Sequence, residues 1–164
     1  MFTNEDEGFV PIYKYLDSRK TYRIKGIEDF LDPYGFADNF RDMIVLDSVI
    51  MNTDRHLGNF GFIVDNKTFR VKRFAPVFDH NMSLLARTAN DNLEATLLSV
   101  RDMGHKLGAD FVMAGRAMLT SRTRKLLENL CDIHIKPHGV YNLQNARINF
   151  LDKAVHEQIT QILE

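Results

Sequence analysis

The chain has 164 residues, of which 45% are hydrophobic and 26% charged, and its net charge at pH 7 is −1. This composition excludes a disordered protein and indicates a globular one. The length suits one domain, which we expect to span residues 1–164. No apolar run is long enough to cross a bilayer, and the acidic start lacks the basic-then-apolar order of a signal peptide. We therefore expect no membrane association.

Cysteine content and charge distribution indicate the cellular compartment and the kinds of partner. Cys131 is the single cysteine, so no internal disulfide can form, which favours a reducing, cytoplasmic compartment. It lies in a helix-like stretch, where we expect it to pack rather than react. Residues 101–125 carry six basic side chains against two acidic ones. We interpret this cluster as the solvated faces of helices and expect no direct nucleic-acid binding.

The first third of the chain predicts helices. Residues 1–26 are aromatic and mixed in charge, with only weak periodicity. A short helix is expected over 27–31, because the Asp-Pro pair at 32–33 is a turn signal. Over 37–51 the apolar spacing is that of a helix with one buried stripe. Asp47 falls on this stripe, either as a buried acceptor that braces the next loop or simply at the stripe's edge.

A loop and a β-hairpin come next. Residues 52–59 have the composition of a loop, and 61–64 form one expected strand. Turn residues follow at 65–68, and 69–74 alternate apolar with basic side chains, as a strand with one exposed face does. Pro76 closes this second strand.

After Leu85 the pattern is helical to the end of the chain. Helices are expected at four places: over 93–100, over 109–119, from a cap at Thr120 or Ser121 to Leu130, and from an N-cap at Asn149 onward. Together these elements predict a mainly α fold with one β-hairpin, in the α+β class.

The residues that carry chemistry lie on either side of the hairpin. The sequence DRHLGN occupies 54–59, and FDHN occupies 78–81. Phosphoryl transfer needs a carboxylate beside the acceptor hydroxyl, and an amide oxygen and a second carboxylate that hold Mg²⁺ against nucleotide phosphates. Asp54 and Asn59 have the spacing of a kinase catalytic loop, and Asp79 follows two strands later, where the DFG aspartate is expected. A hairpin between them would bring both ends to one site.

DRHLGN at 54–59 and APVFD at 75–79 resemble the C-terminal lobe of the HipA-like serine/threonine kinases. These are toxin-type bacterial kinases related in fold to protein kinases and phosphoinositide kinases, and the DRHxxN loop is also similar to that of the phosphoinositide kinases. The resemblance covers residues 36–85. It implies a protein-kinase-like C-lobe that uses ATP and Mg²⁺ to phosphorylate a protein serine or threonine, sometimes on an aminoacyl-tRNA synthetase, and that is restrained by a DNA-binding antitoxin.

The resemblance also implies roles for single residues. Asp54 corresponds to the catalytic base, and Asn59 and Asp79 correspond to the Mg²⁺ ligands that meet the nucleotide. His56 belongs with the catalytic set, where it supports the loop or faces phosphate. Arg55 belongs with the nucleotide-binding set, where it contacts phosphate or pairs with a neighbouring acid.

Two departures from the family pattern stand out. The DFG glycine is absent, since His80 and Asn81 follow Asp79. The chain also has neither a glycine-rich phosphate loop nor a strand lysine of the V-A-I-K type. We therefore expect a large lobe alone, weak or inactive until a separate small lobe completes it.

Two other functions stay open. A non-catalytic binding or regulatory module would keep the shape of the lobe without its chemistry, and the missing small-lobe motifs motivate it. A metal-dependent hydrolase would hold zinc or iron with His56 and His80, which flank the site. The other histidines are expected on the surface or in the core rather than as ligands, namely His105, His134, His138 and His156.

Overall fold

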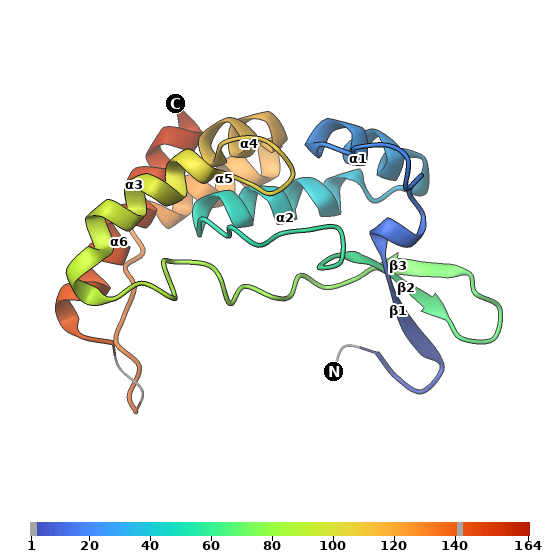
Figure 1. Ribbon diagram of the computed structural model, residues 1–164, viewed down its shortest axis with the longest axis horizontal. Coiled ribbons are helices and arrows are strands. Elements are labelled where there is room, and N and C mark those ends of the chain that lie inside the picture. The colour runs from blue at the N-terminus through green and yellow to red at the C-terminus, as the bar shows by residue number, and fades with distance from the viewer. Residues whose placement is uncertain (1–2, 141–142) are drawn as a thin grey trace.

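The computed structural model describes residues 3–140 and 143–164, and within them the fold combines six α-helices with one three-stranded antiparallel sheet (Figure 1). In chain order the elements are β1 (Glu7–Pro11), η1 (Ile12–Lys14), α1 (Ile24–Leu31), η2 (Asp32–Tyr34), α2 (Ala37–Val49), β2 (Gly61–Asp65), β3 (Val71–Phe74), η3 (Asn90–Asn92), α3 (Leu93–Met103), α4 (Phe111–Met118), α5 (Ser121–Leu130) and α6 (Asn145–Leu163), where η marks a short 3-10 helix.

The sheet has the order β1-β2-β3, so that β2 lies in the middle. Phe9 of β1 pairs with Ile63 of β2, which pairs in turn with Arg73 of β3. β1 comes so close to β2 that a Cβ added at Gly61 would lie 2.2 Å from the carbonyl oxygen of Val10. A glycine is therefore required where the two backbones meet.

The expected hairpin is confirmed as β2 and β3, but the expectation that it stands alone is wrong. β1 comes from the N-terminal segment whose periodicity is weak. It is a five-residue edge strand that contains Gly8 and ends at Pro11, and both residue types blur a strand pattern while an edge tolerates them. Glu7 reaches across β2 to Arg73, which donates to its two carboxylate oxygens at 2.6 and 2.8 Å.

α2 is the central helix. Its buried side chains, such as Phe40 and Ile44, form one core with α1, α4, α6 and the sheet. A second apolar cluster around Met51, Leu85 and Phe111 joins the end of α2 to α3 and α6. The sheet lies at one end of the molecule and α3 at the other, and the extended segment 75–89, here called the return segment, runs alongside α2 between them (Figure 1).

The observed start of α5 and the observed end of α2 can be compared with the expected ones. Thr120 is the N-cap of α5, as one of the two expected alternatives, and Thr123 completes a capping box with it. α2 ends at Val49 instead of Met51. The reason is local, because Met51 has a φ of 52°, in the left-handed region that a helix cannot contain.

The expected start of the last helix is wrong. Gln144, not Asn149, is the N-cap of α6, although its side chain makes no cap hydrogen bond. Arg147 and Ile148 in the first turn are buried, so tertiary packing carries the helix past the capping signal at Asn149. Packing of this kind routinely outweighs a local preference.

Arg147 also holds the return segment against α6. Its guanidinium donates to the carbonyl oxygens of Leu85 and Thr88, both at 2.6 Å, and to the side-chain oxygen of Asn90 at 3.1 Å. The backbone N–H of Leu84 donates to the carbonyl oxygen of Ile50 at 2.9 Å. An extended segment without regular structure is thus fixed at both helices that it passes.

Two further expectations concern the surface. Cys131 is exposed at the end of α5, so the expectation that it packs is wrong, and its Sγ lies 3.5 Å from the Leu127 carbonyl oxygen. Among the helices in the described part of the chain, none combines the length and the apolar character needed to span a membrane.

Candidate functional site

The candidate site is built on a buried ion pair between α2 and the loop that follows it. The side chains of Asp47 and Arg55 are both 0% exposed. Arg55 donates from Nε and Nη2 to the two Asp47 oxygens at 2.6 and 3.0 Å, a bidentate geometry that suits a guanidinium. Its Nη1 donates to the carbonyl oxygens of Asn59 at 2.8 Å and Phe78 at 2.7 Å. One side chain therefore joins α2, the end of the 52–59 loop and the residue before Asp79.

Amide side chains fix the course of the loop. Asn52 is fully buried. Its Nδ2 donates to Asp47 at 2.9 Å, while its Oδ1 accepts from the backbone N–H of Asp54 at 3.1 Å. Asn59 donates from Nδ2 to the carbonyl oxygen of Asp54 at 3.1 Å, so its Oδ1 is the atom that can serve a cation. The expected alternative in which Asp47 is a buried acceptor bracing this loop is confirmed.

His56 shapes the turn inside the loop. Its Nδ1 accepts from the backbone N–H of Gly58 at 3.0 Å, and a Cβ at Gly58 would lie 2.8 Å from the His56 ring. The ring itself is exposed. Of the two roles expected for His56, support of the loop is visible in these contacts.

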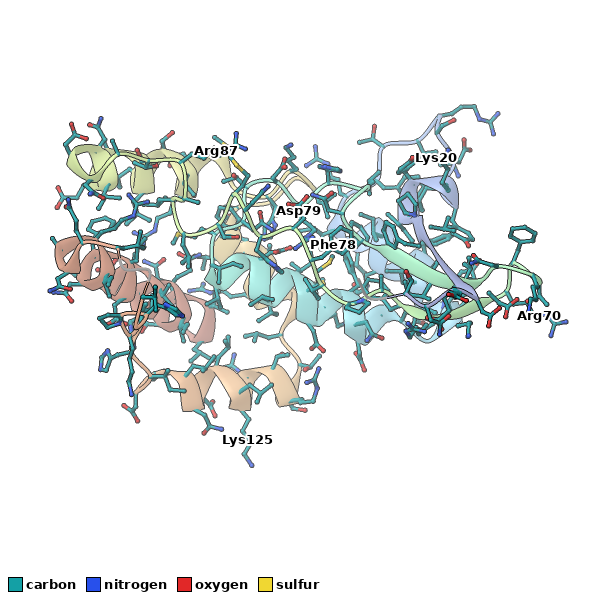
Figure 2. All side chains as sticks on the ribbon, turned by 90° about the horizontal axis from the view of Figure 1, so that it is seen from below. Lys20, Arg70, Phe78, Asp79, Arg87 and Lys125 are labelled. Atoms are coloured by element: carbon teal, nitrogen blue, oxygen red, sulfur yellow. The ribbon has the colours of Figure 1, made fainter. Side chains whose placement is uncertain are left out.

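Asp79 lies on the return segment, beside the 52–59 loop. Its φ of 61° lies in the left-handed region, where a non-glycine residue is strained, and such strain gathers at functional sites. The Asp79 carbonyl oxygen accepts from Asn52 Nδ2 at 3.4 Å, and the Phe78 ring packs edge-on against Phe9 of β1 at 5.3 Å. Phe78 and Asp79 lie near the middle of the molecule, with Arg87 further toward the α3 end (Figure 2).

The Asp79 carboxylate is available to a ligand. Across residues 3–140 and 143–164 it makes no hydrogen bond and no ion pair. Asp54, Asn59 and Asp79 come from two segments separated by the hairpin, and the contacts of Arg55 and Asn52 bring those segments together. The folding back of the chain that the motif spacing predicts is therefore present.

Asp54 has a cationic partner that the motif did not indicate. Lys106, on the segment between α3 and α4, donates from Nζ to Asp54 Oδ1. This hydrogen bond holds the pKa of the Asp54 carboxyl below its ordinary value, although partial burial acts in the opposite direction, and electrostatic interactions with His56 and Arg87 add to the lowering. Asp54 is thus an ionised carboxylate at neutral pH, paired with the Lys106 ammonium.

The segment 104–108 that presents Lys106 is anchored on both sides of it. The His105 ring is 3% exposed and its Nε2 lies 3.0 Å from Ser48 Oγ of α2. Leu107 is also buried. Gly104, with a φ of 64°, has no space for a side chain, since a Cβ would lie 2.4 Å from the Ala109 carbonyl oxygen. Lys106 therefore projects from a rigid turn whose neighbours face the core.

The structure corrects the assignment of Arg55 to the nucleotide-binding residues. Its side chain is enclosed and all of its contacts are to protein groups, including His80 Nε2 at 3.3 Å. A guanidinium in this position cannot reach a bound phosphate. The alternative role, in which Arg55 pairs with a neighbouring acid, is the one observed.

The zinc or iron alternative at His56 and His80 finds no third ligand. Within the described residues, one group of three metal-ligating side chains has ligand atoms close enough to share an ion, and it is His134, Asp152 and His156, which does not include them. A hollow of about 650 Å³ lies elsewhere too, between α1 and α4, and its lining includes Arg23, Glu28 and Met118. Neither feature coincides with Asp54 or Asp79.

Comparison with known proteins gives no match: no family model, no curated protein and no solved structure is significantly similar to the chain. The function of the chain is therefore inferred from its motifs and from the geometry described above.

Proposed function

We propose that this chain is the large lobe of an ATP- and Mg²⁺-dependent serine/threonine protein kinase of the HipA-like type. The observation that carries the proposal is the position of Arg55, which binds the backbone beside Asn59 and the backbone beside Asp79 at once. A kinase needs its catalytic loop and its metal-binding return segment side by side. An unrelated aspartate-rich turn has no reason to be joined to a segment 23 residues away.

The donor set fits the cofactors of such an enzyme. Asp79 offers a carboxylate without a protein partner in the described chain and Asn59 offers an amide oxygen, and Mg²⁺ prefers oxygen ligands of this kind. When bound, ATP supplies the phosphoryl group and Mg²⁺ neutralises its charge. In this proposal Asp54 accepts a hydrogen bond from the substrate hydroxyl and orients it, and Lys106 keeps Asp54 ionised.

The proposed partners follow from the same type of kinase. The substrate is a protein serine or threonine, a small lobe covers the phosphates, and a DNA-binding antitoxin restrains the enzyme in a cytoplasmic setting. The small lobe is the partner that activity requires, because positioning of the nucleotide accounts for much of phosphoryl-transfer catalysis.

A non-catalytic, kinase-shaped binding module is the second candidate, and one contact favours it. Lys106 occupies an Asp54 oxygen that a substrate hydroxyl would need. If this ion pair persists when partners bind, only the Oδ2 atom of Asp54 is left free to orient a substrate hydroxyl. The two candidates therefore differ in whether ligand binding releases Asp54.

Calorimetry of the full chain with Mg²⁺ and ATP tests the metal site first. The kinase proposal expects Asp79→Ala and Asn59→Ala each to weaken Mg²⁺-nucleotide binding about tenfold or more, in line with the loss of a metal ligand. Asp91→Ala, an exposed aspartate of η3, is the matched control and should bind normally. Binding that none of these substitutions changes would favour the non-catalytic module.

Phosphate transfer tests the chemistry. The full chain is mixed with a candidate small lobe, ATP and Mg²⁺, and incorporation of phosphate into protein is followed. Asp54→Ala should reduce transfer by about 10²-fold or more, because the aligned carboxylate is lost, while Asp91→Ala should not. Transfer that survives both Asp54→Ala and Asp79→Ala would remove the kinase proposal.

A further inference from the structure

We propose that His134, Asp152 and His156 form a second metal site, one that takes a zinc-type divalent ion. One ring nitrogen from each histidine and one oxygen of Asp152 all lie within 4.8 Å of one another. The site is separate from Asp54 and Asp79 in sequence and chemistry, so the inference stands whether or not the chain is a kinase lobe.

The three side chains come from two segments that the fold has already brought together. Asp152 and His156 are four residues apart on α6, so they lie on one face of the helix. His134 belongs to the segment that leaves α5 and passes beside α6 (Figure 1). The backbone N–H of Ile135 donates to Asp152 Oδ1 at 2.7 Å, which fixes this segment on the helix.

The ligand atoms of His134 and Asp152 need to move apart only slightly to share an ion. Zinc binds nitrogen and oxygen ligands at about 2.0–2.2 Å, which places tetrahedral ligands about 3.4 Å apart. His134 Nδ1 lies 2.8 Å from Asp152 Oδ2, somewhat closer than two ligands of one ion. The His134 side chain is 69% exposed and is therefore free to shift by the fraction of an ångström that an ion needs.

The His156 ring is prepared for ligation. Its Nδ1 lies 2.7 Å from the carbonyl oxygen of Asp152, and because a carbonyl only accepts, this nitrogen carries the proton. In the neutral ring Nε2 then has a lone pair, and it is buried without a hydrogen-bond partner in the described structure. Histidines that bind metals typically donate their other ring N–H to a backbone carbonyl in this way.

The donor set selects the class of ion. Two imidazoles and one carboxylate suit zinc and its transition-metal neighbours, whereas Mg²⁺ prefers oxygen ligands alone. The Ile135 N–H already holds Asp152 Oδ1, so Oδ2, which faces the His134 ring, is the oxygen that an ion would take. Three protein ligands leave a fourth position for water, and the ion would clip the segment after α5 to α6.

Metal titration of the full chain tests the proposal. After removal of metals with a chelator, Co²⁺ absorption and Zn²⁺ calorimetry should show one equivalent bound, and Zn²⁺ should raise the melting temperature. His134→Gln and His156→Gln should each weaken binding about tenfold or more. Asp152→Asn, which keeps an oxygen for the Ile135 N–H, should do the same.

His138→Gln is the matched control, because His138 is exposed on the same segment and lies outside the group. It should leave the affinity unchanged, and a large excess of Mg²⁺ should not displace Co²⁺. The proposal is overturned if no stoichiometric Zn²⁺ or Co²⁺ binding is found, if binding survives in both His134→Gln and His156→Gln, or if His138→Gln weakens it equally. Circular dichroism of each variant separates loss of a ligand from loss of the fold.

Discussion

Arg55 and Asp47 form a bidentate ion pair that is closed off from solvent, and the same guanidinium binds the backbone on both sides of the candidate site. A buried pair of this kind gives little net stability relative to an apolar substitute, but losing one partner leaves an uncompensated charge or unpaired polar groups in the interior. The pair is therefore best understood as the device that positions the 52–59 loop against the return segment.

Arg55→Lys should destabilise the protein by about 3 kcal/mol, because an ammonium keeps the charge but cannot reproduce the planar bidentate bond to Asp47 together with the bonds to two carbonyl oxygens. Urea unfolding of the full chain measures the change. Arg19→Lys is the control, since Arg19 pairs with Asp17 while 87% of its side chain is exposed, and a change below about 1 kcal/mol is expected there. Equal effects of the two substitutions would contradict the positioning role of Arg55.

Lys106→Met should raise the pKa of the Asp54 carboxyl toward its ordinary value, since the hydrogen bond from Lys106 is the largest cause of its lowering. A carbon-detected NMR titration of the aspartate side chains measures it. Because the pair is partly exposed, the free energy of unfolding at pH 7 should change by less than about 1 kcal/mol. Lys125→Met on α5, remote from Asp79 in Figure 2, is the control and should leave the Asp54 titration unchanged. If Lys125→Met shifted the Asp54 pKa equally, net charge alone would set that pKa.

The sequence alone predicts the part of the site that is local. The spacing from Asp54 to Asn59, the hairpin and the return to Asp79 follow from motif and periodicity, and the structure has the loop and the hairpin where they are expected. Asp47 is visible as a polar residue on an apolar stripe, which is the signal of a buried acceptor.

The parts that the sequence does not reveal depend on distant contacts. Lys106 meets Asp54 across 52 residues, and Arg147 meets Leu85 across 62. Neither lies in a motif, although Gly104 and Gly108 around Lys106 mark a tight turn in hindsight. β1 gains its order from pairing with β2, so its own pattern is weak.

The stability of the protein should fall as the pH drops from about 6.5 to about 4. Burial lowers the pKa of His105 to about 4, from 6.5 for a free imidazole, and the nearby Arg55 charge acts in the same direction while Asp47 and Asp110 oppose it. Between these two pH values the unfolded chain binds the proton and the folded chain does not, so stability rises with pH across this window and is level above it. At about 1.4 kcal/mol per pKa unit, the loss is on the order of 3 kcal/mol.

Urea unfolding at a series of pH values isolates the His105 contribution. His105→Gln removes the titrating ring while keeping a group that can bind Ser48, so the slope between pH 4 and 6.5 should become shallower. His138→Gln removes an exposed histidine and should keep the slope of the parent protein. A parent slope that His105→Gln leaves intact would show that other groups dominate acid unfolding.

Arg147→Gln should release the return segment without unfolding the sheet. The Arg147 guanidinium is the donor to the Leu85 and Thr88 carbonyl oxygens, and hydrogen bonds from a charged donor contribute about 1.5–3 kcal/mol each. Hydrogen exchange should therefore speed up over 84–90, while β2 and β3 keep their protection, because local opening follows the contacts that are lost. Arg116→Gln, which removes donors to the Gln161 carbonyl oxygen at the surface, is the control and should leave 84–90 protected.

If Asp79 owes its place to Arg55 and the loop alone, Mg²⁺-nucleotide binding should survive Arg147→Gln. A parallel loss would show that the far end of the return segment also determines the geometry of the metal site.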